Sequence, residues 1–335
     1  MLSGRSMARS RPGRSPKRRV PKFLLFLGFL AVLALALVIV LVVVLLQPGP
    51  GRVPKGPTTS PPTSRPMAQP ADCPDVLTLV VPGTWESSAD DDPLNPTANP
   101  KSLMLKVSGP LRERFSGART EVYTVPYTAQ FRNPTNLTDR QMDYNASRKQ
   151  GYQRAAAKMA KTNRACPLTG YMLMGFSQGA VIVGDLAQSI ADGRGPIADT
   201  DQDLILGVGL IADGRRQSGK QHDVGPSPSG VGAEVSLGGF GSMVPGITMT
   251  GGRGGFGALE DRVYSICASG DLICDAPTVT NPVKAISQLS GALNSPVHAM
   301  YGTTRYWSAG GVSATRWMYG WAVTRIDGAP SPEHY

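Results

Sequence analysis

The stretch 171–180 limits most strongly what this chain can fold into. It reads Tyr-Met-Leu-Met-Gly-Phe-Ser-Gln-Gly-Ala: a short apolar run ends in a Gly-x-Ser-x-Gly turn, and an apolar run with helical spacing follows. Strand, turn and helix of this kind form a nucleophile elbow, in which small residues around a strained serine let strand and helix approach closely. We predict that Ser177 is an activated nucleophile. Because a chain with 39 glycines can produce this pentapeptide by chance, the prediction needs a base, an acid and oxyanion donors elsewhere.

Short apolar segments alternate with helical patterns along the chain from about residue 73. Strands are predicted at 76–81, 120–127, 171–176, 204–212 and 263–268. Helices are predicted at 99–115, from a Thr138/Gln141 capping box to about residue 164, and at 178–191, 282–293 and 315–326. Short buried strands that alternate with helices predict an α/β fold, in which both faces of a mainly parallel sheet are covered.

The general base must come from one of only three histidines. A serine hydroxyl is a poor nucleophile unless a base removes its proton. His222 lies in a segment rich in Gly and Pro, and His334 is the residue before the last. His298 follows a predicted helix and a candidate acid, so we predict that it is the base. If His298 were only structural, Ser177 would lack a base.

The acid is best placed in the segment Cys-Ala-Ser-Gly-Asp-Leu-Ile-Cys at 267–274. A predicted strand ends there, and a disulfide across the loop would hold Asp271 in one orientation, so that its carboxylate could fix the histidine tautomer. Asp275, which lies outside the two cysteines, is the alternative acid. The alternative interpretation of the loop is that the disulfide only stabilises it and that Asp271 is a solvated aspartate without a catalytic role. The order Ser177, Asp271, His298 is the order of the α/β-hydrolases.

Two backbone N–H groups are candidates for an oxyanion hole. Gln178 follows the serine at the positive end of the predicted helix. Thr84 lies in the turn 82–84, which follows the first predicted strand. An ordinary turn at 82–84 is the alternative. If the strands that lead to Thr84 and Ser177 are parallel neighbours, both residues lie at the carboxyl edge of the sheet, where ligands bind in open α/β folds.

The four cysteines fit two disulfides. Cys73 and Cys166 precede their strands by similar distances, so parallel neighbouring strands would bring them together at the other edge of the sheet. Cys267 would then pair with Cys274. The sequence has no CxxC, no zinc-type spacing of His and Cys and no Gly-rich phosphate loop, so we predict no metal and no cofactor.

The net charge of +10 comes mainly from one end of the chain. Residues 1–22 hold eight of the 34 Lys and Arg residues and no acid, so the remainder has a net charge of about +2. A nearly neutral domain without a basic stripe argues against a nucleic-acid partner.

Residues 23–46 are an unbroken apolar run of 24 residues. About 20 residues span a bilayer, and the basic segment 1–22 before the run would stay in the cytoplasm. We therefore expect one transmembrane helix in the plasma membrane and a domain on the cell-wall or periplasmic side, where disulfides form. An unusually long cleaved signal peptide is the alternative. Residues 47–72, with eight prolines, predict an extended linker before the domain at 73–335.

Residues 214–259 interrupt the alternation of strands and helices with many glycines. One interpretation is a disordered surface insertion. The other is a flap near the site, since loops of this length are usually functional or disordered. As a flap, it would offer an acyl chain the apolar residues Phe240, Met243, Val244, Ile247 and Met249.

Three motifs in order resemble the cutinase family of serine esterases over about residues 72–325. They are Gly-Phe-Ser-Gln-Gly at 175–179, Cys-x-x-Gly-Asp-x-x-Cys at 267–274, and the later His298. The basic segment, span and Pro-rich linker look closer still to membrane-anchored cutinase-like lipases of mycolic-acid-containing actinobacteria. The resemblance implies an α/β-hydrolase sandwich of three layers. It also implies esterase, phospholipase A or thioesterase activity on long acyl chains of envelope lipids.

The family pattern matches this sequence residue by residue at the proposed site, with two departures. Ser177, Asp271 and His298 match the triad, and Thr84 and Gln178 match the oxyanion positions. Phe176 stands where Tyr is common, and 214–259 is longer than in a compact cutinase.

Three functions remain open at this point. The first is a membrane-tethered hydrolase of lipid acyl esters or thioesters. The second is an acyltransferase that passes the acyl group to an envelope sugar or lipid alcohol. The third is a non-catalytic envelope-binding protein. A missing triad residue would favour this function, but the sequence holds all three. The sequence does not define chain length, head group or oligomeric state.

Overall fold

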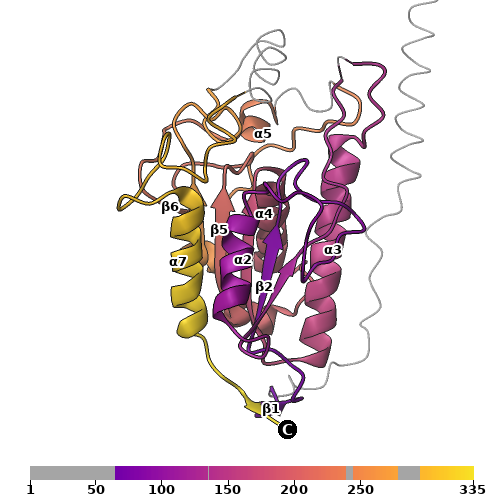
Figure 1. Ribbon diagram of the computed structural model, residues 1–335, viewed down its shortest axis with the longest axis vertical. Helices are drawn as coiled ribbons and strands as arrows, with labels where there is room; N and C mark the ends of the chain where they lie inside the picture. The colour runs from indigo at the N-terminus through magenta and orange to yellow at the C-terminus, as the bar shows by residue number, and fades with distance from the viewer. Residues whose placement is uncertain (1–64, 135, 239–243, 278–294) are drawn as a thin grey trace, which may run out of the picture. The chain divides into compact units, whose positions relative to one another are not determined.

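The computed structural model describes residues 65–335 except 135, 239–243 and 278–294 (Figure 1). A compact unit runs from Ser64 to Tyr335. The predicted span 23–46, the basic segment before it and the predicted helix 282–293 lie outside the described residues. Within the described ranges, no helix is long and apolar enough to cross a bilayer.

A six-stranded sheet forms the centre of the unit, and all of its pairings are parallel. The strand order is β3-β2-β4-β5-β7-β6. The strands are β2 (Val76–Val81), β3 (Thr120–Thr124), β4 (Gly170–Phe176), β5 (Ile205–Ile211), β6 (His222–Asp223) and β7 (Val263–Ile266). Every residue of β2 and β4 is buried, as expected for the centre of a parallel sheet with both faces covered. The predicted α/β fold is confirmed.

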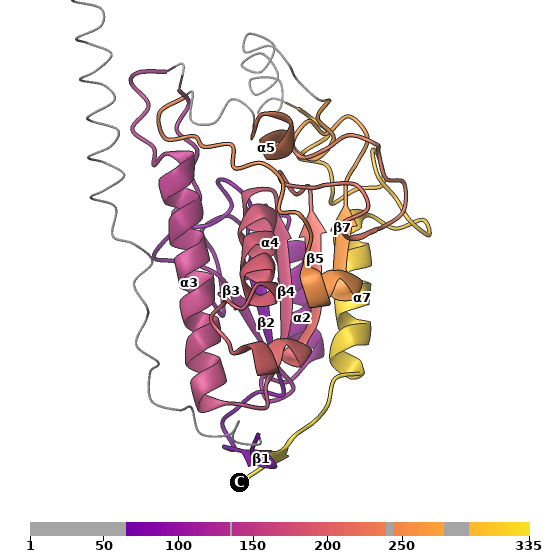
Figure 2. The same ribbon diagram turned by 180° about the vertical axis from the view of Figure 1, so that it is seen from behind.

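Two pairs of helices cover the sheet (Figures 1 and 2). On one face lie α3 (Tyr144–Ala165) and α4 (Gln178–Ala191), and on the other lie α2 (Leu105–Arg114) and α7 (Ala314–Asp327). Side chains alternate along a strand, so Met172 and Met174 of β4 pack in the core with α2 and α7, whereas Leu173 packs with α3 and α4. Shorter elements are α5 (Ala233–Ser236) and the 3-10 helices η1 (Asp199–Leu204) and η3 (Gly257–Arg262).

Both predicted disulfides are present. Cys73 and Cys166 lie just before β2 and at the end of α3, with Cα atoms 5.5 Å apart, and Cys267 and Cys274 close the loop after β7. Two further short strands, β1 (Ala68–Gln69) and β8 (Glu333–His334), pair in parallel and tie the two ends of the unit together.

Two predicted elements differ from the structure, and one strand of the sheet was not predicted. The capping box at Thr138 and Gln141 is wrong: α3 begins at Tyr144, because the Asp143 carboxylate accepts the Ala146 N–H at 2.9 Å and acts as the N-cap. Thr138 instead donates to the Asn136 side chain. The first predicted helix begins six residues later than expected, at Leu105. The strand β6 was missed, because two exposed residues carry no alternating pattern.

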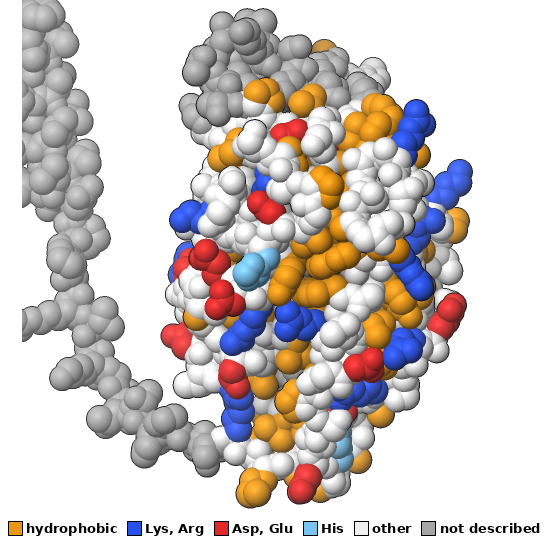
Figure 3. All heavy atoms as spheres, turned by 90° about the vertical axis from the view of Figure 1, so that its left-hand side faces the viewer, with side chains coloured by type: hydrophobic (Ala, Val, Ile, Leu, Met, Phe, Trp, Pro, Cys, Tyr) orange, Lys and Arg blue, Asp and Glu red, His pale blue; other side chains and the backbone are white. Residues whose placement is uncertain are grey.

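The outer side of α7 carries a groove of about 830 Å³ that is separate from the predicted site. Figure 3 shows this side, on which apolar side chains form a band next to basic ones. Trp317 and Trp321 stack with their ring centroids 6.1 Å apart, and Arg316 and Arg325 line the same groove. None of the predicted site residues contributes to its lining.

Candidate active site

The nucleophile elbow has the strained geometry that its sequence predicts. Ser177 lies between β4 and α4 with φ 55° and ψ −121°, a conformation that a non-glycine residue rarely adopts. A Cβ at Gly175 would lie 2.3 Å from the Gly179 carbonyl oxygen, and a Cβ at Gly179 would lie 2.1 Å from the Val81 carbonyl oxygen. Only glycine therefore fits at positions 175 and 179, two residues before and two residues after the serine.

The structure brings Ser177, His298 and Asp271 together from three separate loops. The Ser177 Oγ lies 2.8 Å from His298 Nε2, and His298 Nδ1 lies 2.9 and 3.1 Å from the two carboxylate oxygens of Asp271. The other two histidines lie elsewhere. His222 packs against Tyr264, and His334 is 3.1 Å from Asp75 near the chain end. Only His298 can therefore take a proton from Ser177 directly.

Asp271 is fully buried, and its carboxylate is held by several donors. The Tyr301 hydroxyl donates to it at 2.7 Å and the Ile273 N–H at 3.1 Å. Burial raises the pKa of Asp271, but the charge and hydrogen bonds of His298, together with these donors, hold that pKa below its usual value. The alternative acid, Asp275, accepts the N–H groups of Gly230 and Gly270 and so stabilises the loop.

Tyr301 is a site residue that the sequence reasoning missed. Its hydroxyl accepts the Ala268 N–H at 2.9 Å and donates to Asp271, so it joins the end of β7 to the acid. Burial raises the pKa of Tyr301 well above its usual value, so the hydroxyl stays protonated as a donor. The only sequence feature that could have indicated the support of Asp271 by Tyr301 is a tyrosine three residues after the base. The ring of His298 is held separately by Phe176, which stacks on it at a centroid distance of 4.9 Å.

Replacing Tyr301 with phenylalanine should lower kcat for ester hydrolysis about tenfold. A hydrogen bond to a charged group contributes roughly 1.5–3 kcal/mol, and about 1.4 kcal/mol corresponds to tenfold. Steady-state kinetics and denaturant unfolding of Tyr301→Phe would measure both effects. Tyr306→Phe is the matched control, because Tyr306 is partly exposed and its hydroxyl has no hydrogen bond within the described residues. Equal kcat values for the two variants would contradict the positioning role.

The two predicted oxyanion residues line the same pocket as Ser177. Within the described part of the chain, the N–H groups of Thr84 and Gln178 have no hydrogen-bond partner, so both are available to a ligand. The Gln178 side-chain oxygen accepts from Tyr127 and Ser147, at 3.2 and 3.0 Å. These bonds fix Gln178 at the first position of α4, where the helix dipole favours negative charge.

Glu86 was not predicted but supports the turn that carries Thr84. Its carboxylate accepts the N–H groups of Gly83 and Leu103, at 3.1 and 2.8 Å, and the Ser102 hydroxyl at 3.0 Å. Burial raises the pKa of Glu86 even though these bonds favour the charged form. The turn 82–86 is thereby attached to the segment that leads into α2.

A pocket of about 720 Å³ surrounds Ser177 and has two unlike sides. The side towards α3 and α4 is mainly apolar and is lined by Phe131, Tyr144, Val181, Met249 and Ile273. The side towards α2 is mixed: its polar residues Asn99, Lys101, Lys106, Ser295 and Thr303 lie beside the apolar Pro100, Leu103 and Ala299. Because α2 and α3 cover opposite faces of the sheet, the serine at the end of β4 lies between these two sides.

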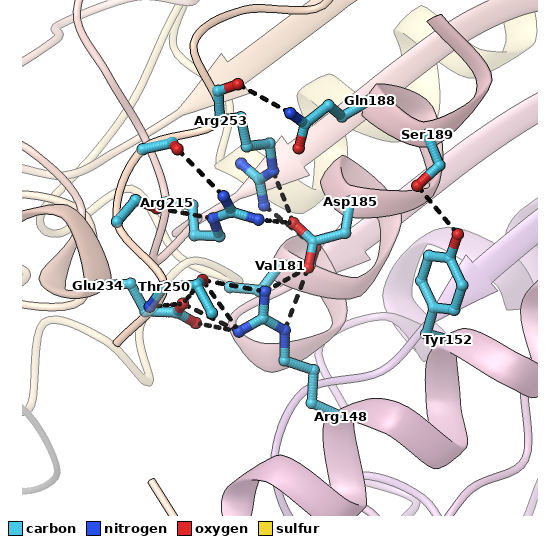
Figure 4. A network of polar contacts seen from close by, with 12 residues as sticks. Arg148, Tyr152, Val181, Asp185, Gln188, Ser189, Arg215, Glu234, Thr250 and Arg253 are labelled. Atoms are coloured by element: carbon cyan, nitrogen blue, oxygen red, sulfur yellow. Dashed lines mark hydrogen bonds and ion pairs between the residues drawn. The ribbon is translucent and has the colours of Figure 1, made fainter. Parts of the chain in front are cut away.

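The described parts of 214–259 are fixed by partly buried ion pairs (Figure 4). Asp185 of α4 contacts Arg215 at 2.6 Å and Arg253 at 2.9 Å, and it also pairs with Arg148 of α3. Arg148 in turn contacts Glu234 at 2.9 Å. These contacts disagree with the interpretation of a disordered insertion for residues 214–238 and 244–259.

Of the apolar residues named in the flap interpretation, the structure describes Val244, Ile247 and Met249, and one of these three reaches the pocket. Met249 lines the pocket. Val244, Ile247 and Met249 pack with Phe131 and Tyr144 in one apolar cluster. The predicted contributions of residues 240 and 243 lie outside the described residues.

Comparison with known proteins gives the family. A protein-family model described as Cutinase matches residues 97–306, more than half of the chain. The chain belongs to the cutinase family. A carboxylesterase of Corynebacterium glutamicum, the Culp6 homolog, is 44% identical over 279 residues, which cover 81% of this chain and 87% of that protein.

Two solved structures that resemble this chain share less of its sequence. A cutinase-like protein from Cryptococcus sp. is 19% identical, with a TM-score of 0.45, and covers 78% of this chain and all of its own. An acetylxylan esterase solved at 0.90 Å resolution is 14% identical, with a TM-score of 0.46, over 76% of this chain and 99% of its own.

Proposed function

We propose that this member of the cutinase family is a serine hydrolase of acyl esters. The observation that carries the proposal is the chain of hydrogen bonds from Ser177 Oγ through His298 to the buried Asp271. His298 Nε2 accepts the serine proton as Oγ attacks the acyl carbonyl, and Asp271 stabilises the imidazolium that forms. The backbone N–H groups of Thr84 and Gln178 bind the oxyanion.

The second half of the reaction reuses the same groups. His298 gives its proton to the departing alcohol or thiol, which leaves an acyl group on Ser177. A water molecule then loses a proton to His298 and attacks the acyl carbonyl, and His298 returns that proton to Ser177 Oγ as the acid leaves. Ester and thioester substrates follow the same steps, because only the leaving atom differs.

The substrate we propose is a lipid of the cell envelope. Two features support this: the apolar side of the pocket, formed by residues such as Phe131 and Met249, suits an acyl chain, and the run 23–46 predicts a membrane anchor. The domain would then act outside the plasma membrane. Phospholipase A and thioesterase activity belong to this proposal. Transfer of the acyl group to a sugar or lipid alcohol is the second candidate, because an alcohol can replace water in the second step.

A fluorophosphonate probe tests the proposal on the full chain. We expect covalent labelling, with the labelled peptide containing Ser177, and loss of p-nitrophenyl ester hydrolysis in proportion to labelling. Labelling of another residue, or hydrolysis that survives complete labelling, would contradict it. Product analysis with and without added alcohol separates the hydrolase from the transferase. Undetectable turnover of short and long acyl esters by folded protein would favour a non-catalytic role.

A further inference from the structure

Two lysines lie on the α2 side of the pocket, away from its apolar side. Lys101 and Lys106 both line the pocket, and both side chains are exposed. The stem of Lys106 packs next to Gly302, because a Cβ at Gly302 would lie 3.1 Å from Lys106 Cδ and Cε. A lysine stem against protein surface with its ammonium group in water is a common arrangement. The two ammonium groups are therefore available at the pocket.

Neither lysine is neutralised within the described part of the chain. Neither Lys101 nor Lys106 forms an ion pair there. Lys106 lies in the first turn of α2, which holds no acidic residue. The positive end of the helix dipole therefore adds to the charge of the lysines.

Two described acids, one in the pocket lining and one in the loop before Lys101, are occupied by other donors. Glu86, which also lines the pocket, accepts two N–H groups and one hydroxyl and pairs with neither lysine. Asp91, in the loop before Lys101, accepts the N–H groups of Thr97 and Ala98. Among the described residues, the α2 side of the pocket therefore keeps two positive charges without a counterion.

The opposite side of the pocket carries no such excess of charge. Its acid, Glu234, is paired with Arg148 at 2.9 Å and accepts the Tyr144 hydroxyl at 2.6 Å. The remaining side chains there, such as Phe131 and Met249, are apolar. The pocket thus combines an apolar side for an acyl chain with a cationic side on the other flank of Ser177.

We propose that Lys101 and Lys106 bind an anionic group, such as a phosphate, on the alcohol or thiol part of the substrate. The inference rests on the proposed function, and it names the substrate class: acyl esters or thioesters whose leaving group is negatively charged. The acyl chain lies on the Phe131 side and the leaving group on the α2 side, with the carbonyl between them at Ser177. The lysines bind the leaving group and take no part in proton transfer.

The test compares esters that share an acyl chain and a glycerol unit. The full chain is assayed with a monoacylglycerol, with the corresponding acylglycerol 3-phosphate and with the zwitterionic acylglycerol phosphocholine, all below their aggregation concentrations. We expect kcat/KM to be about tenfold higher for the phosphate than for the neutral ester, because two partly exposed ion pairs together contribute up to about that factor. Added salt should reduce this preference by screening.

The double variant Lys101→Gln/Lys106→Gln should bring the phosphate-to-neutral ratio of kcat/KM close to one. Lys161→Gln, an exposed lysine on α3 outside the pocket lining, should keep the wild-type ratio. A wild-type ratio near one, or an unchanged ratio in the double variant, would overturn the inference. Either result would leave the proposed function intact, provided that the protein hydrolyses p-nitrophenyl esters. If folded wild-type protein hydrolyses none of these esters, the proposed function itself fails.

Discussion

Replacing Ser177 with alanine should lower kcat for ester hydrolysis by about 10⁴- to 10⁶-fold, the largest effect expected of any single substitution in this chain. The Ser177 Oγ is the only hydroxyl that the structure places at hydrogen-bond distance, 2.8 Å, from His298 Nε2 within the described residues. Without it, no acyl-enzyme forms. The residual rate would come from substrate binding and the oxyanion N–H groups of Thr84 and Gln178 alone. Steady-state kinetics on a p-nitrophenyl ester measures the effect.

The double variant Ser177→Ala/His298→Ala should be no slower than Ser177→Ala, because the two residues act as a unit. Ser218→Ala is the matched control, since Ser218 is exposed and has no hydrogen bond in the described part of the chain. It should keep the wild-type kcat. A Ser177→Ala enzyme with more than a hundredth of the wild-type kcat would show that another group is the nucleophile.

Local sequence patterns were sufficient for most of the fold and for the three residues that meet at the site. The elbow could be predicted because its glycines have no tolerated substitute: a Cβ at Gly175 or Gly179 would collide with backbone atoms. Asp271 could be predicted because Cys267 and Cys274 lie on either side of it and form a disulfide. The base could be predicted because the chain has only three histidines, and His298 alone follows the candidate acid without lying at the chain end.

The parts that sequence did not predict depend on contacts between residues far apart in the chain. Tyr301 supports Asp271, and Glu86 supports the turn of Thr84, but neither belongs to a periodic pattern or a motif. The start of α3 was misplaced because Asp143 and Thr138 are both suitable caps, and Gln141, the partner in the predicted box, instead accepts from the distant Trp85 Nε1 at 2.6 Å. In the same way, the Gly-rich composition of 214–259 gave no indication that its arginines would meet Asp185.

Replacing Asp185, the acid at the centre of these ion pairs, should have the second large effect, a loss of stability. Arg148, Arg215 and Arg253 all contact the carboxylate of Asp185, which lies on α4, and form one cluster with it. Asp185→Asn keeps the shape of the side chain and removes the charge. It should lower the free energy of unfolding by roughly 2–3 kcal/mol, somewhat less than for a fully buried pair, because Asp185 is partly buried and three arginines lose the charge that compensates them. The asparagine amide keeps one acceptor oxygen, so Arg148, Arg215 and Arg253 lose the negative charge and one of the two oxygens that they share.

Asp192→Asn, just past the end of the same helix, is the control, because Asp192 and its partner Arg194 are both exposed. Denaturant unfolding should show a change within about 0.5 kcal/mol for that variant. Since Arg215 and Arg253 hold the segment whose Met249 lines the pocket, Asp185→Asn should also reduce kcat/KM more for long acyl esters than for short ones. Equal stability of the two variants would contradict the cluster's role as the anchor of 214–259.

The pH dependence separates loss of charge from loss of packing. Burial raises the pKa of Asp185, but Arg253, Arg148 and Arg215 more than offset it and hold the pKa below its usual value. A depressed carboxylate pKa stabilises the fold fully above the unfolded-state pKa of about 3.9, and this stabilisation is lost as the pH falls through the folded-state pKa. The difference in free energy of unfolding between wild type and Asp185→Asn should therefore be constant above about pH 5 and shrink below about pH 4. A difference that stayed constant through this acid range would mean that shape, and not charge, accounts for the loss.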